Sequence, residues 1–291
     1  MTRSTTDAER DASVEVLVVA YGAPGLLEES LATLDGKLPV TVLDNSSRSD
    51  VKEVCRRLEV RYVDTGSNLG FAGGVNMGIA RRLHPGADLL LLNPDARITA
   101  EGIHALRVCL HASPRRACVA PRQTGMGGET ARVSWPFPSP AGAWADALGL
   151  GQFRKGRQFL IGSVLLIKAD ALAEVGGFDE RYFLYAEETD WQYRAQHLGW
   201  TSDLCTEVVA THVGAGTGGD PTVRDTHFHA STERYVRKHH GTVGWNLFRA
   251  GVMTGAAVRA LLLPRNRGDG ARARLALYRT GPCRAETQLP S

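Results

Sequence analysis

The feature that most constrains the fold is an alternation of short apolar runs with helical segments in the first third of the chain. Four runs rich in valine, isoleucine or leucine, at 14–20, 39–43, 60–63 and 88–92, are separated by segments that favour short helices. Continuous apolar runs of this length indicate strands buried on both faces, and their alternation with helices indicates right-handed βαβ units. The sequence therefore predicts an α/β protein with a mostly parallel sheet flanked by helices.

Acidic residues follow two of these runs, at Asp44 and at Asp95 in Asn93-Pro94-Asp95. Ligands of parallel sheets bind beyond the carboxyl ends of the strands. Asp44 could there accept a hydrogen bond from a nucleotide base, or it could form an Asx turn or cap a helix. Asp95 beside a diphosphate would require a hard cation, Mg²⁺ or Mn²⁺, between the two charges. The alternative for Asp95 is a plain turn.

The glycine-rich segment 66–78 leads into a predicted helix. Its glycines permit a close approach of the backbone to a ligand, and a helix N-terminus favours an anion. The segment is not G-x-G-x-x-G and follows the third strand rather than the first. This arrangement argues against a dinucleotide-binding fold.

Three carboxylates, Glu187, Glu188 and Asp190, open a predicted helix at 187–198. One of them could be a general base, because acidic neighbours raise the pKa of a carboxyl group. The alternative is structural: acidic side chains favour the first turn of a helix, and Asp190 can pair with Arg194. His212 ends a predicted strand at 207–212, where it could bind a metal or a diphosphate, or be structural.

Charge is distributed unevenly along the 291 residues. Residues 1–231 contain 23 Lys and Arg against 28 Asp and Glu, whereas residues 232–291 contain 11 against 3. The basic tail suggests an anionic partner, and without a zinc-finger, RRM or basic-zipper pattern we expect no nucleic acid. The apolar stretch 243–263 contains arginines, so we expect an interfacial membrane helix or a helix packed on the body rather than a spanning segment.

Five cysteines without a C-x-x-C pair indicate a reducing compartment, and the polar N-terminus lacks the apolar core of a signal peptide. We therefore expect a cytoplasmic protein that is either free or peripheral on the inner face of the plasma membrane. The expected organisation is a disordered segment at 1–13, a catalytic domain at 14–231 and a helical tail at 232–291. Segment 121–157 is rich in glycine and proline, which predicts a long loop over a site. The apolar segment 159–167 predicts a strand.

Seven segments stand in the order found in family 2 glycosyltransferases, and the chain resembles above all their rhamnosyltransferase-like branch. They are VVAYGAP, VLDNSS, SNLGFAGGVNMGI, LLLLNPDARI, FLIGSVLLI, GGFDERYFLYAEETDWQYRAQHLGW and THVGAGT. The resemblance implies a GT-A fold with a Rossmann-like sheet, a divalent cation and transfer with inversion. It also implies a dTDP- or UDP-sugar donor, with rhamnose favoured, and a saccharide or lipid-linked acceptor in cell-envelope polysaccharide or glycoconjugate synthesis.

The resemblance also assigns roles to single residues. Asp44 matches the position that contacts the nucleotide base, and Asp95 and His212 match the positions at the metal and diphosphate. Glu188 matches the general base, with Asp190 as a rival. Near the acceptor the resemblance places Gly162, Ser163 and Trp191. The other residues expected at the donor are Ala20, Tyr21, Gly22, Asn68, Gly70, Phe71, Gly74, Asn76 and Asn93.

This sequence departs from the family pattern at three places. Asn93 replaces the first Asp of a full D-x-D motif, Glu188 stands where many relatives have Asp, and YGAP replaces the usual Tyr-Asn. The sequence argues against three other functions. A sugar-nucleotide dehydrogenase or a nucleotidyltransferase would need a glycine-rich signature after the first strand, where this chain has YGAPG. A non-catalytic sugar-binding module would not explain the set of Asp95, Glu188 and His212.

Overall fold

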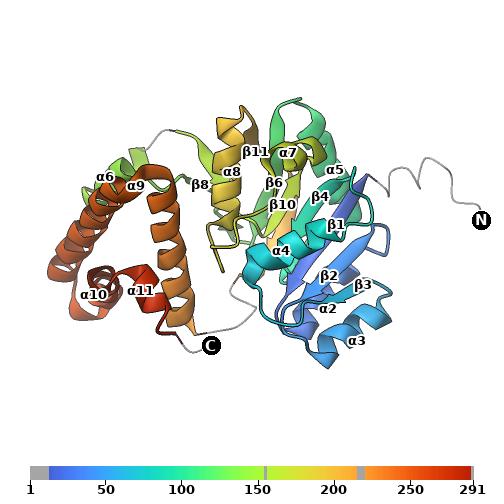
Figure 1. Ribbon diagram of the computed structural model, residues 1–291, viewed down its shortest axis with the longest axis horizontal. Coiled ribbons are helices and arrows are strands. Elements are labelled where there is room, and N and C mark those ends of the chain that lie inside the picture. Colours follow the sequence, from blue (N-terminus) through green and yellow to red (C-terminus); the bar gives the residue numbers. More distant parts are fainter. Residues whose placement is uncertain (1–12, 154–155, 215–219, 290–291) are drawn as a thin grey trace, which may run out of the picture. The chain divides into compact units, whose positions relative to one another are not determined.

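The computed structural model describes residues 13–153, 156–214 and 220–289 (Figure 1). The segment expected to be disordered, 1–13, lies outside these residues except for Ser13. The elements in chain order are β1 (Val14–Ala20), α2 (Pro24–Ala32), β2 (Val40–Asp44), α3 (Ser49–Arg57), β3 (Arg61–Asp64), α4 (Gly70–Ala80), β4 (Asp88–Leu92), β5 (Ala96–Arg97), α5 (Ala100–His111), β6 (Arg116–Thr124), β7 (Thr130–Ala131), β8 (Ser134–Pro136), α6 (Pro140–Ala147), η1 (Gly151–Phe153), β9 (Gln158–Leu160), β10 (Val164–Ile167), α7 (Ala169–Val175), α8 (Glu187–His197), β11 (Thr201–His212), α9 (Pro221–Leu262), α10 (Arg265–Thr280) and α11 (Pro282–Glu286).

The chain forms two compact units. The first consists of the described parts of 1–135, 158–180 and 187–218, and the second of 136–157, 181–186 and 219–291. The domain boundary expected at residue 231 falls inside α9, all of which belongs to the second unit. The second unit also takes in α6, which lies in the segment expected to be a loop.

The first unit is built on a mixed sheet in the order β3-β2-β1-β4-β10-β6-β11-β5, with β7 beside β6. The four N-terminal strands are parallel, and β6 is parallel to β11. Only β10 separates the two parallel groups, since it runs antiparallel to both β4 and β6. The predicted mostly parallel sheet is confirmed, with its first four strands in the expected βαβ arrangement.

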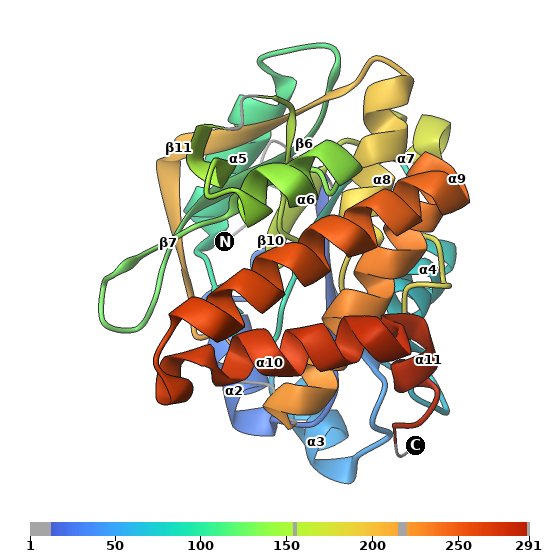
Figure 2. The same ribbon diagram turned by 90° about the vertical axis from the view of Figure 1, so that its left-hand side faces the viewer.

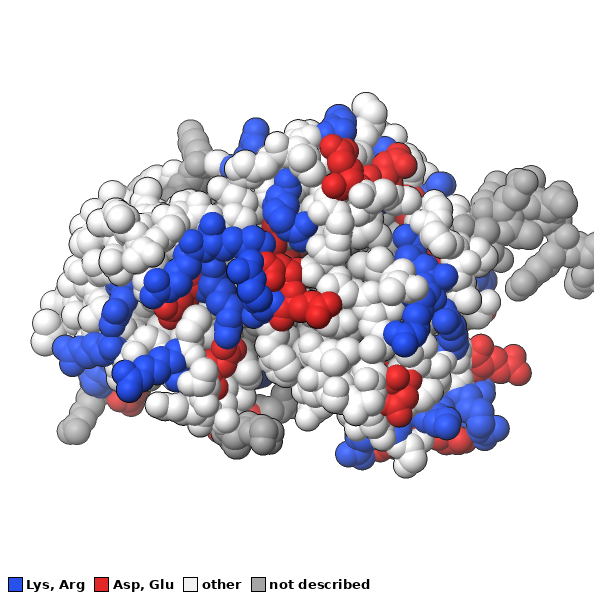
Figure 3. All heavy atoms as spheres, in the orientation of Figure 1, with Lys and Arg blue, Asp and Glu red and all other residues white. Residues whose placement is uncertain are grey.

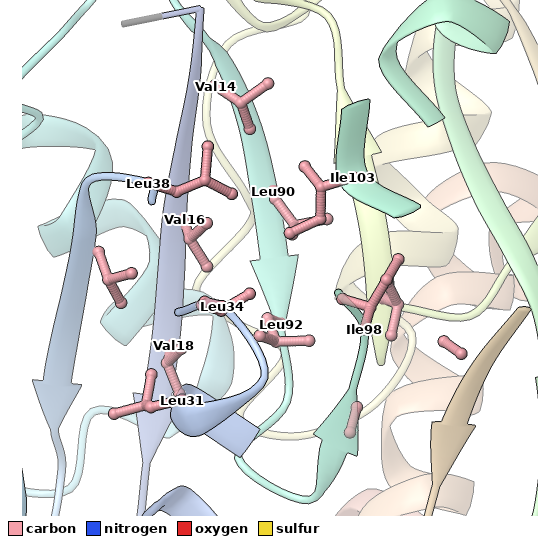
Figure 4. Close-up of a cluster of buried hydrophobic side chains, with 14 of the residues drawn as sticks. Val14, Val16, Val18, Leu31, Leu34, Leu38, Leu90, Leu92, Ile98 and Ile103 are labelled. Atoms are coloured by element: carbon pink, nitrogen blue, oxygen red, sulfur yellow. The ribbon is translucent and has the colours of Figure 1, made fainter. Parts of the chain in front are cut away.

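Two apolar layers cover the two faces of this sheet. On one face, side chains of α2, α3 and α5 pack on alternate residues of the strands, among them Val16, Val18 and Leu90 (Figure 4). On the other face, α4, α7 and α8 pack on the intervening residues, such as Leu17, Leu89 and Leu91. The strands are therefore buried on both sides, which is why they are continuously apolar in the sequence.

Three segments differ from the sequence-based expectation. The strand expected at 159–167 is divided into β9 and β10 by a turn at 161–163. Segment 121–157 is not one long loop: it contains the end of β6, two short strands, α6 and η1. Segment 100–124, for which the sequence indicated no element, forms α5 and β6. The sequence did not indicate the strand β6 because β6 and its partner β11 carry polar residues among the apolar ones.

The glycines of α4 allow this helix to lie very close to the sheet. A Cβ atom added to Gly74 would lie 2.8 Å from Val19 Cγ1, and one added to Gly78 would lie 2.7 Å from Leu17 Cδ1. Both distances are too short for real Cβ contacts. Asn76 on the same helix donates to the carbonyl of Phe178 and accepts from its N–H. In this structure these residues of α4 therefore hold the fold together.

The second unit is helical, and its longest element is α9, which is kinked at Gly241 with φ 66° (Figure 2). Helix α6 lies so close to α9 that a Cβ added to Gly255 would be 3.0 Å from Ala147 Cα. Trp245 is buried and stacks on Phe248 and Tyr278. The first part of the apolar stretch 243–263 is thus packed inside its own unit. No helix in the described residues is long and apolar enough to cross a bilayer.

Candidate active site

The turn after β4 brings Asp95 next to His212, which lies 117 positions further along the chain. The N–H of Asn93 donates to the carbonyl of Ser163 (2.8 Å), and Asp95 itself is 4% exposed. Short strand β5 follows at once and pairs with the end of β11, with Ala96 opposite His212. As a result, His212 Nε2 lies 3.2 Å from Asp95 Oδ1. The two residues that were expected at a metal site are therefore neighbours.

Glu188 lies in the first turn of α8 with its carboxyl group buried. Its Oε2 has no hydrogen-bond partner among the described residues. Burial raises the pKa of Glu188 to about 7, although backbone hydrogen bonds of Glu188, Thr189 and Gly162 oppose the rise. A carboxyl group that gains and loses its proton near neutral pH is suited to general base catalysis.

The other two carboxylates of this turn are in different environments. Glu187 is buried with one unpartnered oxygen, and burial together with the Glu188 charge raises its pKa well above the ordinary value. Asp190 is fully buried and accepts a hydrogen bond of 3.0 Å from Arg194. The guanidinium of Arg194 also donates to the carbonyls of Val175 and Gly177. The charge of Asp190 is therefore neutralised by Arg194, which two backbone carbonyls hold in place. This is the ion pair that the structural alternative predicted.

The turn between β9 and β10 connects the Asp95 turn with the carboxyl group of Glu188. Gly162 lies against Glu188, since a Cβ added there would be 3.6 Å from its Cβ and Cγ. The next residue, Ser163, accepts the hydrogen bond from Asn93 through its carbonyl, while its buried hydroxyl is bonded to Gln123. Two consecutive residues therefore place the carboxyl edge of β4 beside the first turn of α8.

Trp191 is not available to an acceptor in this structure. Its side chain is fully buried, its indole N–H donates to the carbonyl of Gly176 (2.8 Å), and its ring stacks on Phe178. Trp191 was expected near the acceptor, and in this structure its ring is part of the core. The reason is geometric: Trp191 lies on the face of α8 that packs on the sheet.

A hollow of about 530 Å³ opens at the carboxyl ends of β1 and β2. Tyr21 on its wall is 56% exposed, and Gly22 donates its N–H to Ser46 Oγ (3.1 Å). Of the expected donor residues, Tyr21, Gly22 and Asn68 line it, whereas Ala20, Gly70 and Gly74 are buried and Phe71 packs against the core. Its lining residues are Tyr21, Gly22, Asn45, Ser46, Ser47, Arg48, Gly66, Ser67 and Asn68.

Asp44, the last residue of β2, is fully buried and accepts four hydrogen bonds. Oδ1 accepts from the N–H and the hydroxyl of Ser46, at 2.9 and 2.6 Å. Oδ2 accepts from the N–H of Arg48 and the hydroxyl of Tyr62, both at 3.0 Å. A carboxylate has about four acceptor positions, so none is left for a ligand.

Six residues on the wall of this hollow were not expected at the donor: Asn45, Ser46, Ser47, Arg48, Gly66 and Ser67. The first four belong to the same D-N-S-S-R segment as Asp44, and the signal was their position just after a strand. Only the acidic residue was considered there, because a carboxylate is the more familiar acceptor. The fold turns the following residues toward the hollow instead.

A sheet in this order, with Asp95 next to His212 and the buried carboxyl group of Glu188 against the Gly162–Ser163 turn, is the arrangement of a glycosyltransferase of the GT-A type. A mannosyltransferase from Pyrobaculum calidifontis, solved with GDP-Man and Mn²⁺, superposes with a TM-score of 0.58. It is 16% identical, and the match covers 95% of this chain and 83% of that one. At that identity the match shows a common fold.

Sequence relatives show the family. An N-acetylglucosaminyl-diphospho-decaprenol L-rhamnosyltransferase from Mycobacterium tuberculosis is 30% identical over 263 residues, covering 79% of this chain and 85% of the relative. A hexosyltransferase of low-salt glycan biosynthesis from Haloferax volcanii is 28% identical over 232 residues, covering 77% and 72%. No protein-family model matches the sequence. The chain belongs to the family 2 glycosyltransferases, as its motifs predicted.

Proposed function

We propose that this glycosyltransferase moves a sugar from a nucleoside diphosphate to an acceptor hydroxyl with inversion, using a divalent cation. The observation that carries the proposal is the joining of Asp95, His212 and Glu188 through the turn at Gly162 and Ser163. Asp95 and His212 offer one oxygen and one nitrogen ligand. Glu188 offers an unpartnered carboxyl oxygen and packs against Gly162, the neighbour of the residue that accepts from Asn93.

The residues present fit a divalent cation that is shared with the substrate. In the described residues no group of three or more His, Cys, Asp or Glu side chains is placed to hold a metal. Mg²⁺ and Mn²⁺ in phosphate-transfer and related sites are commonly held by one or two protein ligands together with substrate oxygens and water. When bound by Asp95 and His212, the cation would neutralise the charge that develops on the departing diphosphate.

The other steps follow from the chain's own residues. Glu188 accepts the proton of the acceptor hydroxyl, since its pKa near 7 leaves it largely unprotonated above neutral pH. The hydroxyl then attacks the anomeric carbon on the side opposite the diphosphate, which inverts the configuration there. Asp190 holds Arg194, and through it the loop at Val175 and Gly177, in place.

Rhamnose from a dTDP-sugar, or a hexose from a UDP-sugar, is the proposed donor group, and a lipid-linked saccharide the proposed acceptor. The mycobacterial relative supports both parts by its name, which describes transfer of L-rhamnose to a polyprenyl-diphosphate sugar. Synthesis of a cell-envelope polysaccharide or glycoconjugate is the process that these substrates suggest.

A panel of nucleotide sugars tests this proposal. We expect dTDP-rhamnose or a UDP-hexose to be slowly hydrolysed with Mn²⁺ and not with EDTA, because water can replace the acceptor. NMR of the first product should show the anomeric configuration opposite to that of the donor. Consumption that is independent of the cation would contradict the metal site, and retained configuration would contradict direct displacement. If no nucleotide sugar is consumed, the proposed reaction is wrong.

The protein's membrane contact is proposed to be a surface of the second unit, which we call the apolar patch. Its most exposed members, Leu148, Phe153, Leu261 and Leu262, are each two thirds or more exposed. Leu148 and Phe153 follow α6 in the chain, Leu261 and Leu262 end α9, and α6 packs along α9. The face of this unit that Figure 3 shows carries many Lys and Arg side chains, which favours a bilayer with anionic lipids, as at the inner face of a plasma membrane. The patch consists of Leu148, Leu150, Phe153, Val258, Leu261 and Leu262.

Vesicle co-sedimentation tests the apolar patch. We expect the protein to sediment with vesicles that contain phosphatidylglycerol, and less with phosphatidylcholine alone. The double variant Leu261→Glu, Leu262→Glu should have an affinity for these vesicles about tenfold or more below that of wild type, because the two leucines can no longer enter the interface. Leu83→Glu is the matched control, because Leu83 is an exposed leucine of the first unit. Equal soluble fractions for wild type and the double variant would exclude this surface.

A further inference from the structure

Two consecutive residues just before α8, Tyr185 and Ala186, have a left-handed backbone. Their φ angles are 68° and 65°. Residues with a side chain disfavour this conformation, and bulky ones adopt it rarely. Among the described residues other than glycine, no other two neighbours in sequence share it. Such strain persists only where the surrounding structure imposes it, so contacts with other residues must hold this segment.

The contacts that hold the segment come from α9. The hydroxyl of Ser231, which is fully buried, donates to the carbonyl of Leu184 at 2.8 Å. The ring of Phe228 meets that of Tyr185 edge to face, with 5.9 Å between the centroids. Phe228 and Ser231 are three positions apart, which places them on the same face of the helix. One turn of α9 therefore fixes the two residues that lead into Ala186.

The chain passes from one compact unit to the other directly after this pair. Segment 181–186 belongs to the second unit, as α9 does, and Glu187 begins α8 of the first. Glu188, the proposed base, is thus two positions from Ala186. Its carboxyl group is buried against Gly162 and has an oxygen without a partner among the described residues. The place where α8 begins therefore sets how this carboxyl group is buried.

We propose that Tyr185 and Ala186 are positioning residues, which fix the start of α8 and so hold the carboxyl group of Glu188 in its buried position. Helix α9 imposes the left-handed conformation on them through Leu184 and Tyr185. Such precision matters in catalysis, because a displacement of about 1 Å can lower a rate by about 100-fold. This inference rests on the proposed function, since it concerns the base of the same reaction.

Ala186→Gly releases the strain and removes only a methyl group. Glycine adopts a positive φ about as readily as a negative one, so the segment gains freedom within the same fold. We expect turnover of a nucleotide sugar to fall about tenfold or more, while KM for the donor changes less than about twofold. Turnover should also rise with pH through a lower midpoint than the value of about 7 in wild type, because a mobile carboxyl group meets more water.

NMR titration of Glu188 gives a second measurement, which needs no turnover. In protein labelled with ¹³C at the side-chain carboxyl carbon of glutamate, the signal that is lost in Glu188→Gln belongs to Glu188. We expect the pKa of this group to fall from about 7 in wild type to about 6 or below in Ala186→Gly, since exposure to water favours the charged form.

Two matched pairs of variants control for general effects. Glu59→Gly makes the same backbone change at a left-handed residue just after α3, with φ 55°, and should keep the turnover and midpoint of wild type. Ser231→Ala should lower turnover about threefold or more, because the carbonyl of Leu184 loses its donor. Thr232→Val is its control, since the Thr232 hydroxyl bonds only within α9 among the described contacts. Thermal melting checks the fold of each variant.

The outcomes separate this inference from the function on which it rests. If Ala186→Gly keeps the turnover and the carboxyl pKa of wild type, the pair is a plain turn and the inference is wrong, while the proposed function stands. A loss of turnover with an unchanged pKa, or an equal loss in Glu59→Gly, would overturn it as well. If wild type consumes no nucleotide sugar, the proposed function fails, and the NMR titration still decides whether this pair sets the burial of Glu188.

Discussion

Glu188→Gln is expected to lower the turnover number by about 10²–10⁴-fold while donor affinity stays near that of wild type. Glutamine has the shape of glutamate but cannot accept the acceptor's proton, and a positioned general base contributes about this factor. The donor should still bind, because its diphosphate is assigned to Asp95 and His212 at the other side of the Gly162 turn. Steady-state kinetics and calorimetric titration with the nucleotide sugar would measure the two effects.

Asp190→Asn is the comparison for this result, since sequence alone left both carboxylates open. Its ion pair with Arg194 is buried, so the main expected effect is a lower free energy of unfolding. Near wild-type turnover in Glu188→Gln, together with a loss of two orders of magnitude or more in a folded Asp190→Asn, would assign the base to Asp190.

The pH dependence gives an independent check on Glu188. Turnover of the wild type should rise with pH through about 7, the pKa of Glu188, because only the unprotonated carboxylate accepts a proton. The folded protein also holds this proton more tightly than an exposed glutamate does. The free energy of unfolding should therefore decrease as pH rises from about 4.5 to about 7, and Glu188→Gln should remove the share of this decrease that comes from Glu188, while Glu187 still contributes. A rise in pKa from 4.5 to about 7 corresponds to about 3 kcal/mol.

Asp95→Asn is expected to lower turnover by about 100-fold or more and to weaken binding of the donor in the presence of Mn²⁺. The amide keeps the volume of the side chain but loses its charge, and a metal ion at a developing anion contributes several kcal/mol. The donor affinity of the variant should depend much less on Mn²⁺ than that of wild type. Titration of nucleotide with and without Mn²⁺ would measure this dependence.

Asp88→Asn is a matched control for the Asp95 variant. Asp88 is also a buried carboxylate beside a histidine, with His111 Nε2 at 2.7 Å, but it begins β4 instead of following its end. It also accepts from Arg107 and from the N–H of Ala169, so its loss should lower stability. A loss of Mn²⁺ dependence in Asp88→Asn equal to that of Asp95→Asn would show that the effect is not specific to the carboxyl edge.

The edge of the sheet at which we propose the site could be predicted from local sequence. Asp44 and Asp95 each follow an apolar run, and parallel strands carry such residues to the same edge of a sheet. The structure places both at the ends of their strands. Burial of the strands on two faces imposes this pattern directly on the sequence, which is why it was visible without the fold.

The partners of each polar residue could not be predicted, because they come from distant parts of the chain. Sequence alone left Glu188 and Asp190 equivalent, and only the packing of α8 decides that one has a free oxygen and the other has Arg194. Trp191 was expected near the acceptor on the resemblance alone, and only the packing of α8 shows that its ring is buried in the core.

The sequence by itself determined the class of fold, the family and the edge of the sheet that carries the site, because these depend on short-range patterns of apolar, acidic and glycine residues. The tertiary structure decided which of those residues remain unpaired. That question depends on hydrogen bonds and burial between segments far apart in the chain, such as the turn at Gly162 and Ser163 that lies between Asn93 and Glu188.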